Sequence, residues 1–272
     1  IRDKQICLVG SEMCIRDRGT VGPMHVHRFG SGKPRVLALH GFAQHGGHFW
    51  EIAPYFGAGV VAPDLPGHGP DPHLPATMDE AVARVVDLID EYTPDIVLGY
   101  SMGGRVALRA LLHRSVPMAV LVSATAGLHG VAIRSRRTEA DAALADRIEA
   151  DGLGPFVDEW VDLPMFARLD RRGDVWKGRD RDLRMANTAA GVAASLRGMG
   201  QGVTVPVEDP QLASIDTAVL CLAGAGDEHY VTEAERMAMS MGRASAVIHP
   251  TAGHNLIGED PGWVAIHDRR SL

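Results

Sequence analysis

The chain has 272 residues, of which 46% are hydrophobic and 22% are charged, a composition that is ordinary for a globular protein and excludes wholesale disorder. With 27 basic and 34 acidic side chains the net charge is −7, so a general nucleic-acid-binding surface is not expected. An anionic ligand would have to be held by a local group of arginines. The three cysteines, Cys7, Cys14 and Cys221, are too few and too scattered for a disulfide framework or a paired-cysteine metal site.

The sequence predicts neither a membrane span nor a secretory signal. The longest uncharged stretch, residues 115–133, is broken by Pro117 and Gly127 and is interpreted as a buried strand followed by a loop. Residues 1–18 lack a secretory apolar region and resemble a translated sequencing adapter, so we expect a non-native or disordered extension there. We expect a cytoplasmic protein.

From residue 24 onward, apolar strands alternate with amphipathic helices. Strands are predicted at 24–29, 35–40, 59–62, 95–98, 118–122, 217–222 and 244–248, and helices at 78–92, 102–112 and 232–241. This alternation predicts an α/β fold with a mostly parallel sheet that helices cover on both faces. The segment 30–34 lacks the spacing of a phosphate-binding loop and is interpreted as a hairpin turn.

The alternation of strands and helices is interrupted in the middle of the chain. Residues 127–212 are mostly helical in pattern and richer in charge than their surroundings, and strand–helix alternation resumes after them. We therefore expect a core formed by residues 19–126 and 213–272, with residues 127–212 inserted between two of its strands as a helical lid.

The strongest chemical signal is the run Gly99-Tyr100-Ser101-Met102-Gly103, which follows an apolar strand and opens a helix. In that context G-x-S-x-G predicts a nucleophile elbow, a tight turn that lifts the serine hydroxyl above the edge of the sheet. The alternative, a serine that only caps a helix, explains the glycines less well.

A serine needs an imidazole and an orienting carboxylate to become reactive. Asp227 lies in the loop after one predicted strand, and His254 lies in the loop after the next. The order Ser101, Asp227, His254 is the order expected in a fold with a nucleophile elbow. Glu228 is the alternative candidate for the acid of this triad, and His249 is the alternative candidate for the base.

The backbone N–H groups of Phe42, shortly after a strand, and of Met102, directly after the serine, are predicted to form an oxyanion hole. Several histidines near these loops fit no familiar metal-ligand spacing, so we predict no metal site among them and interpret them as loop or structural residues: His40, His45, His48 and His68.

Together these motifs resemble the α/β-hydrolase superfamily. Further motifs narrow the resemblance to the 2-succinyl-6-hydroxy-2,4-cyclohexadiene-1-carboxylate synthases of menaquinone biosynthesis. They are GYSMGGRVAL at 99–108, SATAGL at 123–128, R-x-R-R-x-x-x-D at 134–141, F-x-x-x-W-x-x-x-P-x-F at 156–166, R-x-x-N at 184–187 and GVAASLRGMGQG at 191–202.

The resemblance implies a lyase in which the triad acts as a base, removes a ring proton and releases pyruvate without an acyl-enzyme. It implies a substrate with three carboxylates, for which guanidinium groups are suited because they pair bidentately and keep their charge when desolvated. His229 stands where the family commonly has a lysine. The substrate-binding positions implied by the resemblance are Tyr100, Arg105, Arg134, Trp160, Arg184 and His229.

Two other functions stay open at this point. A serine carboxylesterase or a carbon–carbon bond hydrolase of the same fold would use Ser101 covalently. A non-catalytic binding protein is less favoured, because all three triad residue types are in place. We expect no metal or organic cofactor, a small polycarboxylate substrate, no nucleic-acid or membrane partner, and a monomer or small homo-oligomer.

Overall fold

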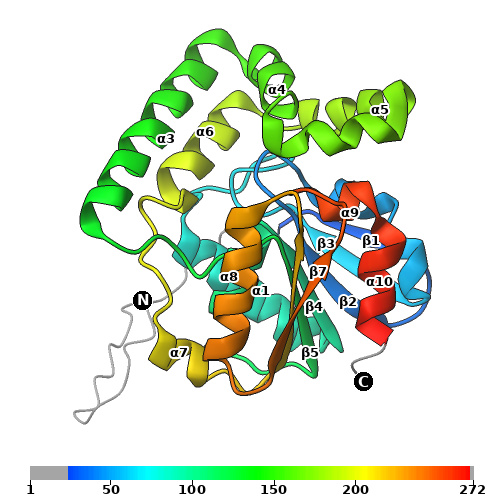
Figure 1. Ribbon diagram of the computed structural model, residues 1–272. Helices are drawn as coiled ribbons and strands as arrows, with labels where there is room; N and C mark the ends of the chain where they lie inside the picture. The colour runs from blue at the N-terminus through cyan, green and yellow to red at the C-terminus, as the bar shows by residue number, and fades with distance from the viewer. Residues whose placement is uncertain (1–23, 270–272) are drawn as a thin grey trace, which may run out of the picture.

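The computed structural model describes residues 24–269, so the adapter-like segment at 1–18 lies outside the described residues. The centre is a seven-stranded sheet (Figure 1) with strand order β1-β3-β2-β4-β5-β6-β7. The edge strand β1 is antiparallel to β3, and all other neighbours are parallel. The strands are β1 (Val26–Phe29), β2 (Pro34–Leu39), β3 (Gly59–Pro63), β4 (Ile96–Tyr100), β5 (Met118–Val122), β6 (Ala218–Gly224) and β7 (Ala244–His249).

Both faces of the sheet are covered. Successive side chains of a strand point to opposite faces, so Val97 of β4 joins one apolar cluster and Leu98 the other. The first face is covered by α1 (Met78–Tyr92), α2 (Met102–Ala110) and α8 (Glu228–Ser240). The second is covered by the 3-10 helices η1 (Gly46–Trp50) and η2 (Ala53–Phe56) and by α9 (Leu256–Glu259) and α10 (Pro261–Arg269). This double cover explains why the strands are almost continuously apolar.

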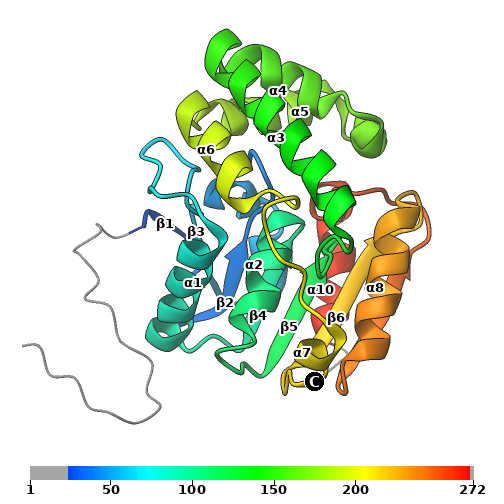
Figure 2. The same ribbon diagram turned by 90° about the vertical axis from the view of Figure 1, so that its left-hand side faces the viewer.

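A helical lid lies between β5 and β6 in sequence and above the carboxyl ends of the strands in space (Figures 1 and 2). It has its own apolar cluster, in which Ile148, Phe156 and Val192 pack with Ala43 from the core. Among the helices of residues 24–269, none combines the length and the apolar character that a membrane-spanning segment requires. The lid consists of α3 (Val131–Asp151), α4 (Leu153–Val161), the 3-10 helix η3 (Pro164–Arg172), α5 (Gly173–Met185) and α6 (Ala189–Met199), and the short α7 (Asp209–Ala213) leads back to the core.

The α/β fold with a mostly parallel sheet is confirmed, but the predicted hairpin at 30–34 is wrong. That segment connects β1 to β2, yet the two strands are not neighbours, because β3 lies between them. The reason is burial. All of β3 is buried, which suits an interior position, whereas β1 carries partly exposed polar residues, which suit an edge.

Candidate active site

Ser101 lies in a strained turn between β4 and α2. Its φ is 50° and its ψ is −108°, a conformation that non-glycine residues rarely adopt. A side chain at Gly103 would collide with the carbonyl group of Leu39, and a side chain at Gly99 would lie within 2.7 Å of Gly103. The two glycines of the motif are therefore required by close backbone approach, and the turn holds Ser101 at the carboxyl end of the sheet.

Three side chains that follow β4, β6 and β7 form a hydrogen-bonded chain. His254 Nε2 lies 3.0 Å from Ser101 Oγ, and His254 Nδ1 lies 2.7 Å from Asp227 Oδ2. An ionised carboxylate only accepts hydrogen bonds, so the imidazole proton is on Nδ1 and Nε2 is free to accept the serine hydroxyl. His254 is 2% exposed, which shields the chain from bulk water.

The two alternative candidates, Glu228 and His249, lie outside this hydrogen-bonded chain. Glu228 is exposed at the start of α8. His249 Nδ1 accepts the backbone N–H groups of Thr251 and Ala252, and its Nε2 lies 3.4 Å from Asp260. Neither residue belongs to the chain of contacts through Ser101.

Sequence reasoning did not identify Ser123 as part of this arrangement. It follows β5 directly, is fully buried, and has a positive φ of 47°. Its hydroxyl donates a hydrogen bond to the carbonyl oxygen of His254 at 2.8 Å. Ser123, at the end of β5, therefore holds the backbone of His254, which follows β7. In the sequence, the position of Ser123 directly after a predicted central strand could have indicated this role.

The loop after β2 brings Phe42 to the same place. Phe42 and Met102 both line the cavity that contains Ser101 and His254. Within residues 24–269, neither backbone N–H donates a hydrogen bond, so both are available to an oxygen atom in the cavity. The loop is held by its neighbours: Ala43 N–H donates to His68 Nε2, and Gly41 N–H donates to the Gln44 side chain.

The cavity has a volume of about 300 Å³ and lies between the lid and the sheet. One wall is aromatic. The ring centroids of Phe42 and Trp160 are 5.1 Å apart, and Phe166 lies 5.9 Å from His254. Tyr100 is also part of the lining, and burial holds the pKa of its phenol well above the usual range. Aromatic residues of both the lid and the core therefore line the cavity that contains Ser101.

Three arginines line the cavity in the described part of the chain: Arg105, Arg137 and Arg184. Arg184 is 2% exposed and donates to Asp180 at 2.7 Å, but its Nη1 atom has no hydrogen-bond partner among the described residues. Burial, together with the charge of Arg109, lowers the pKa of Arg105 to about 10, so this guanidinium remains charged at neutral pH. The cavity lining therefore has more cationic than anionic side chains, although the chain as a whole has a negative net charge.

Arg134 and His229 are not in the cavity. Arg134 is in the first turn of α3, where its guanidinium reaches back to the carbonyl oxygen of Leu128, and Arg137, one turn further on, lines the cavity instead. His229 is exposed because α8 begins directly after Asp227, and its helical phase turns the next residue, Tyr230, inward. The Tyr230 ring lies 4.5 Å from that of His254.

Asp141 is a lining residue that the sequence analysis did not single out. It accepts a hydrogen bond from Arg137 at 2.8 Å through Oδ1. Its other oxygen, Oδ2, is buried and has no hydrogen-bond partner among the described residues. The cavity therefore offers a strong acceptor as well as three cations. The R-x-x-x-D spacing on α3 contained this information, since residues four apart share a helix face.

Known proteins resemble this chain in sequence and in structure. A family profile described as "Alpha/beta hydrolase family" matches residues 36–266. A Bacillus subtilis protein, provisionally named 2-succinyl-6-hydroxy-2,4-cyclohexadiene-1-carboxylate synthase, is 32% identical over 83% of the chain and 85% of its own length. The synthase of that name from Serratia proteamaculans is 28% identical over 82% of the chain and 87% of its own length.

Among solved structures, MenH from S. aureus superposes with a TM-score of 0.83 at 26% sequence identity, covering 91% of this chain and 97% of that one. A thermophilic esterase from Thermogutta terrifontis has a TM-score of 0.76 at 24% identity and covers 91% of this chain and 92% of its own. The second likeness concerns the fold alone.

Proposed function

The chain belongs to the alpha/beta hydrolase family, and from this premise we propose that it is a lyase of menaquinone biosynthesis that eliminates pyruvate from a succinyl-enolpyruvyl-cyclohexene carboxylate. The relatives named as synthases of the ring product support this assignment. The observation that supports this proposal most strongly is the composition of the cavity: a serine that is hydrogen-bonded to a buried histidine lines the same cavity as three arginines.

In the proposed reaction the triad works as a base. His254 takes the proton of the Ser101 hydroxyl while Ser101 Oγ takes the ring proton next to the succinyl carbonyl group. The electrons of the broken C–H bond add a second double bond to the ring and the C–O bond to the enolpyruvyl group breaks. The leaving group then takes the proton held by His254 and departs as pyruvate, which returns the base to its starting state. Asp227 holds the tautomer of His254 that this transfer requires.

Negative charge develops on the carbonyl oxygen as the ring proton leaves. The N–H groups of Phe42 and Met102, both at the cavity, are suited to stabilise it. No covalent bond to Ser101 is needed at any step.

The charged groups of the cavity match the proposed substrate. Arg105, Arg137 and Arg184 are equal in number to its carboxylates, and Arg184 Nη1 has an unused donor. Asp141 Oδ2 has unused acceptor capacity, which suits the ring hydroxyl group.

The second candidate is a serine carboxylesterase or a carbon–carbon bond hydrolase. The hydrogen bond between His254 Nε2 and Ser101 Oγ favours it, since the same geometry activates a serine for acyl transfer.

Incubation of the chain with the enolpyruvyl intermediate and, separately, with an aryl acetate distinguishes the two functions. The lyase predicts release of pyruvate from the intermediate and at most slow turnover of the ester. A burst of phenol from the ester with no pyruvate from the intermediate would establish the hydrolase instead.

A further inference from the structure

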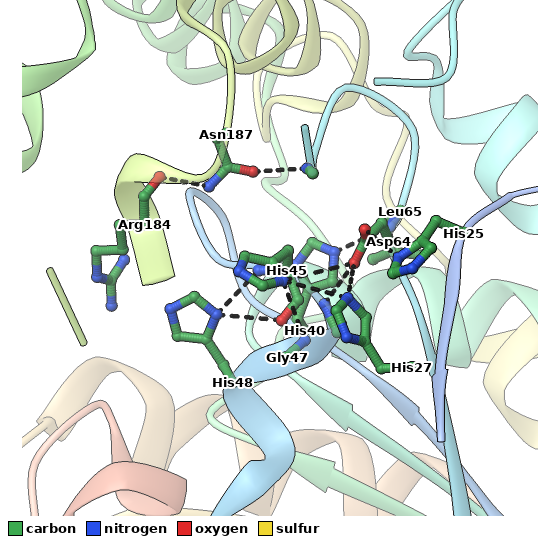
Figure 3. Close-up of polar contacts among 12 residues, drawn as sticks. His25, His27, His40, His45, Gly47, His48, Asp64, Leu65, Arg184 and Asn187 are labelled. Atoms are coloured by element: carbon green, nitrogen blue, oxygen red, sulfur yellow. Dashed lines mark hydrogen bonds and ion pairs between the residues drawn. The ribbon is translucent and has the colours of Figure 1, made fainter. Parts of the chain in front are cut away.

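A second group of polar side chains lies at the β1 edge of the sheet, where β1 meets the end of β3 (Figure 3). His25 and His27 are two residues apart along an extended segment, so both side chains point to the same face. In the β1–β3 pairing Val26 lies opposite Pro63, and the Asp64 N–H donates to the His25 carbonyl at 2.9 Å. Asp64 therefore lies across from the two histidines.

The ligating atoms of these three residues converge. His25 Nδ1 is 3.0 Å from Asp64 Oδ2, His27 Nε2 is 3.0 Å from Asp64 Oδ1, and all three ligand atoms lie within 4.8 Å of one another. Ligand atoms bound to one zinc ion at about 2.0–2.1 Å are separated by roughly 3–3.5 Å, so only small movements are needed to admit a metal.

We propose that His25, His27 and Asp64 form a binding site for a divalent transition-metal ion of the Zn²⁺ type. Two imidazoles and one carboxylate are ligands that such ions prefer. Both imidazoles bind as neutral groups, through the nitrogens that now face the carboxylate. The side chain of His25 is 58% exposed, which gives the ion a path from solvent and leaves room for a water ligand.

A backbone hydrogen bond fixes the position of the Asp64 carboxylate. Asp64 is 3% exposed, and its Oδ1 accepts the backbone N–H of Gly46 at 2.8 Å. Such outer contacts orient a metal-binding carboxylate. The His45 imidazole is also close, with Nδ1 3.7 Å from Asp64 Oδ1, but this nitrogen accepts the N–H of Gly47. His45 is therefore not one of the proposed ligands, and the exposed side chain of His25 leaves the three-ligand set open to solvent on that side.

The metal would join the edge strand to Asp64, which follows β3 and packs against the loop that follows β2. Asp64 contacts that loop at Gly46, and the same loop carries Phe42 at the cavity. None of the three ligands lines the cavity, so the site is separate from the proposed chemistry and its expected effect is on stability.

Titration of the full chain with Zn²⁺ by calorimetry, and with Co²⁺ by visible absorption, tests the proposal. We expect one Zn²⁺ per chain and a higher Tm in its presence. His25→Ala and His27→Gln are each expected to weaken binding by about tenfold or more and to abolish the Tm increase. His113→Ala, at an exposed histidine just after α2, is the matched control and is expected to bind like the unchanged protein.

The cysteines at positions 7 and 14 are a competing source of zinc ligands, so the double variant Cys7→Ser/Cys14→Ser is titrated in parallel. Undiminished binding in this variant, together with loss in His25→Ala, supports the proposal. Equal affinity of His25→Ala and the unchanged chain, loss of binding in the cysteine variant alone, or no binding of Zn²⁺ at all would overturn it.

Discussion

The core and the lid supply the cavity in different ways. Ser101, Asp227 and His254 come from strand ends, and parallel strands bring their carboxyl ends to one edge whatever the details of packing. Arg137 and Arg184 come from lid helices, where helical phase and the tilt of each helix decide which side chain reaches the cavity. Chain order is thus a good guide to the triad, whereas on the lid the sequence motifs indicated Arg184 correctly but Arg134 in place of Arg137.

The largest expected effect belongs to the core. Ser101→Ala removes the group proposed to take the ring proton and should lower the kcat of pyruvate release on the order of 10⁴-fold, as removal of a triad member does elsewhere. Steady-state pyruvate assays measure this, with circular dichroism as a check on folding. Unchanged kcat would mean that the triad has no part in the reaction.

Buried histidines in the loops of the core predict that the free energy of unfolding depends on pH. Burial lowers the pKa of His68 to about 4, and it lowers the pKa values of His40 and His48 as well. Because the unfolded chain then binds more protons between pH 6.5 and 4, the free energy of unfolding falls as the pH falls through this window.

For His68 alone the loss amounts to about 3 kcal/mol once the pH is below 4. Urea unfolding at pH 7, 5.5 and 4.5 measures it. His68→Gln should flatten the profile and the exposed control His113→Gln should not. A profile that is flat from pH 7 to 4.5 in the unchanged protein would contradict the neutral, buried state of these rings.

Within the lid, two arginines of the same helix form a matched pair. Arg137→Gln removes a cation of the cavity and should lower kcat/KM by about 10- to 100-fold, mainly through KM, because hydrogen bonds to charged groups contribute roughly 1.5–3 kcal/mol. Arg134→Gln, whose guanidinium bonds to the Leu128 carbonyl instead, should change kcat/KM by less than about threefold. A larger loss of kcat/KM in Arg134→Gln than in Arg137→Gln would show that Arg134, and not Arg137, contacts the substrate during turnover.

The smallest effect is expected on the outer surface of the lid. Arg197 pairs with Glu149 and Asp146, and these hydrogen bonds raise its pKa, but the side chain is 38% exposed. Solvent screens such pairs, so Arg197→Ala should cost less than about 1 kcal/mol in unfolding free energy. Chemical denaturation measures this, and a loss of several kcal/mol would mean that the lid depends on surface charge.

Much of the fold and part of the site were accessible from the sequence. Apolar runs and the glycines around Ser101 predicted the parallel sheet and the strained turn, because both follow from local chemistry. The position of β1 was not predicted, since strand order depends on non-local pairing, and the hairpin interpretation was wrong.

The side chains of the site were harder to predict than its backbone. The resemblance indicated Arg134, whereas Arg137 lines the cavity, because a motif can predict a helix without predicting which of its side chains reach a cavity. The resemblance indicated His229, at the position of a family lysine, whereas Tyr230 lines the cavity because α8 begins at Glu228 and turns that residue inward. The contacts of Ser123 and Asp141 required the neighbouring elements to be in place.

The most direct test of the central claim follows both products and the mass of the chain while it turns over the enolpyruvyl intermediate. The account predicts one pyruvate for each cyclohexadiene formed and no mass added to Ser101 at any time. A chain that gains a covalent adduct at Ser101 while pyruvate stays absent would contradict it.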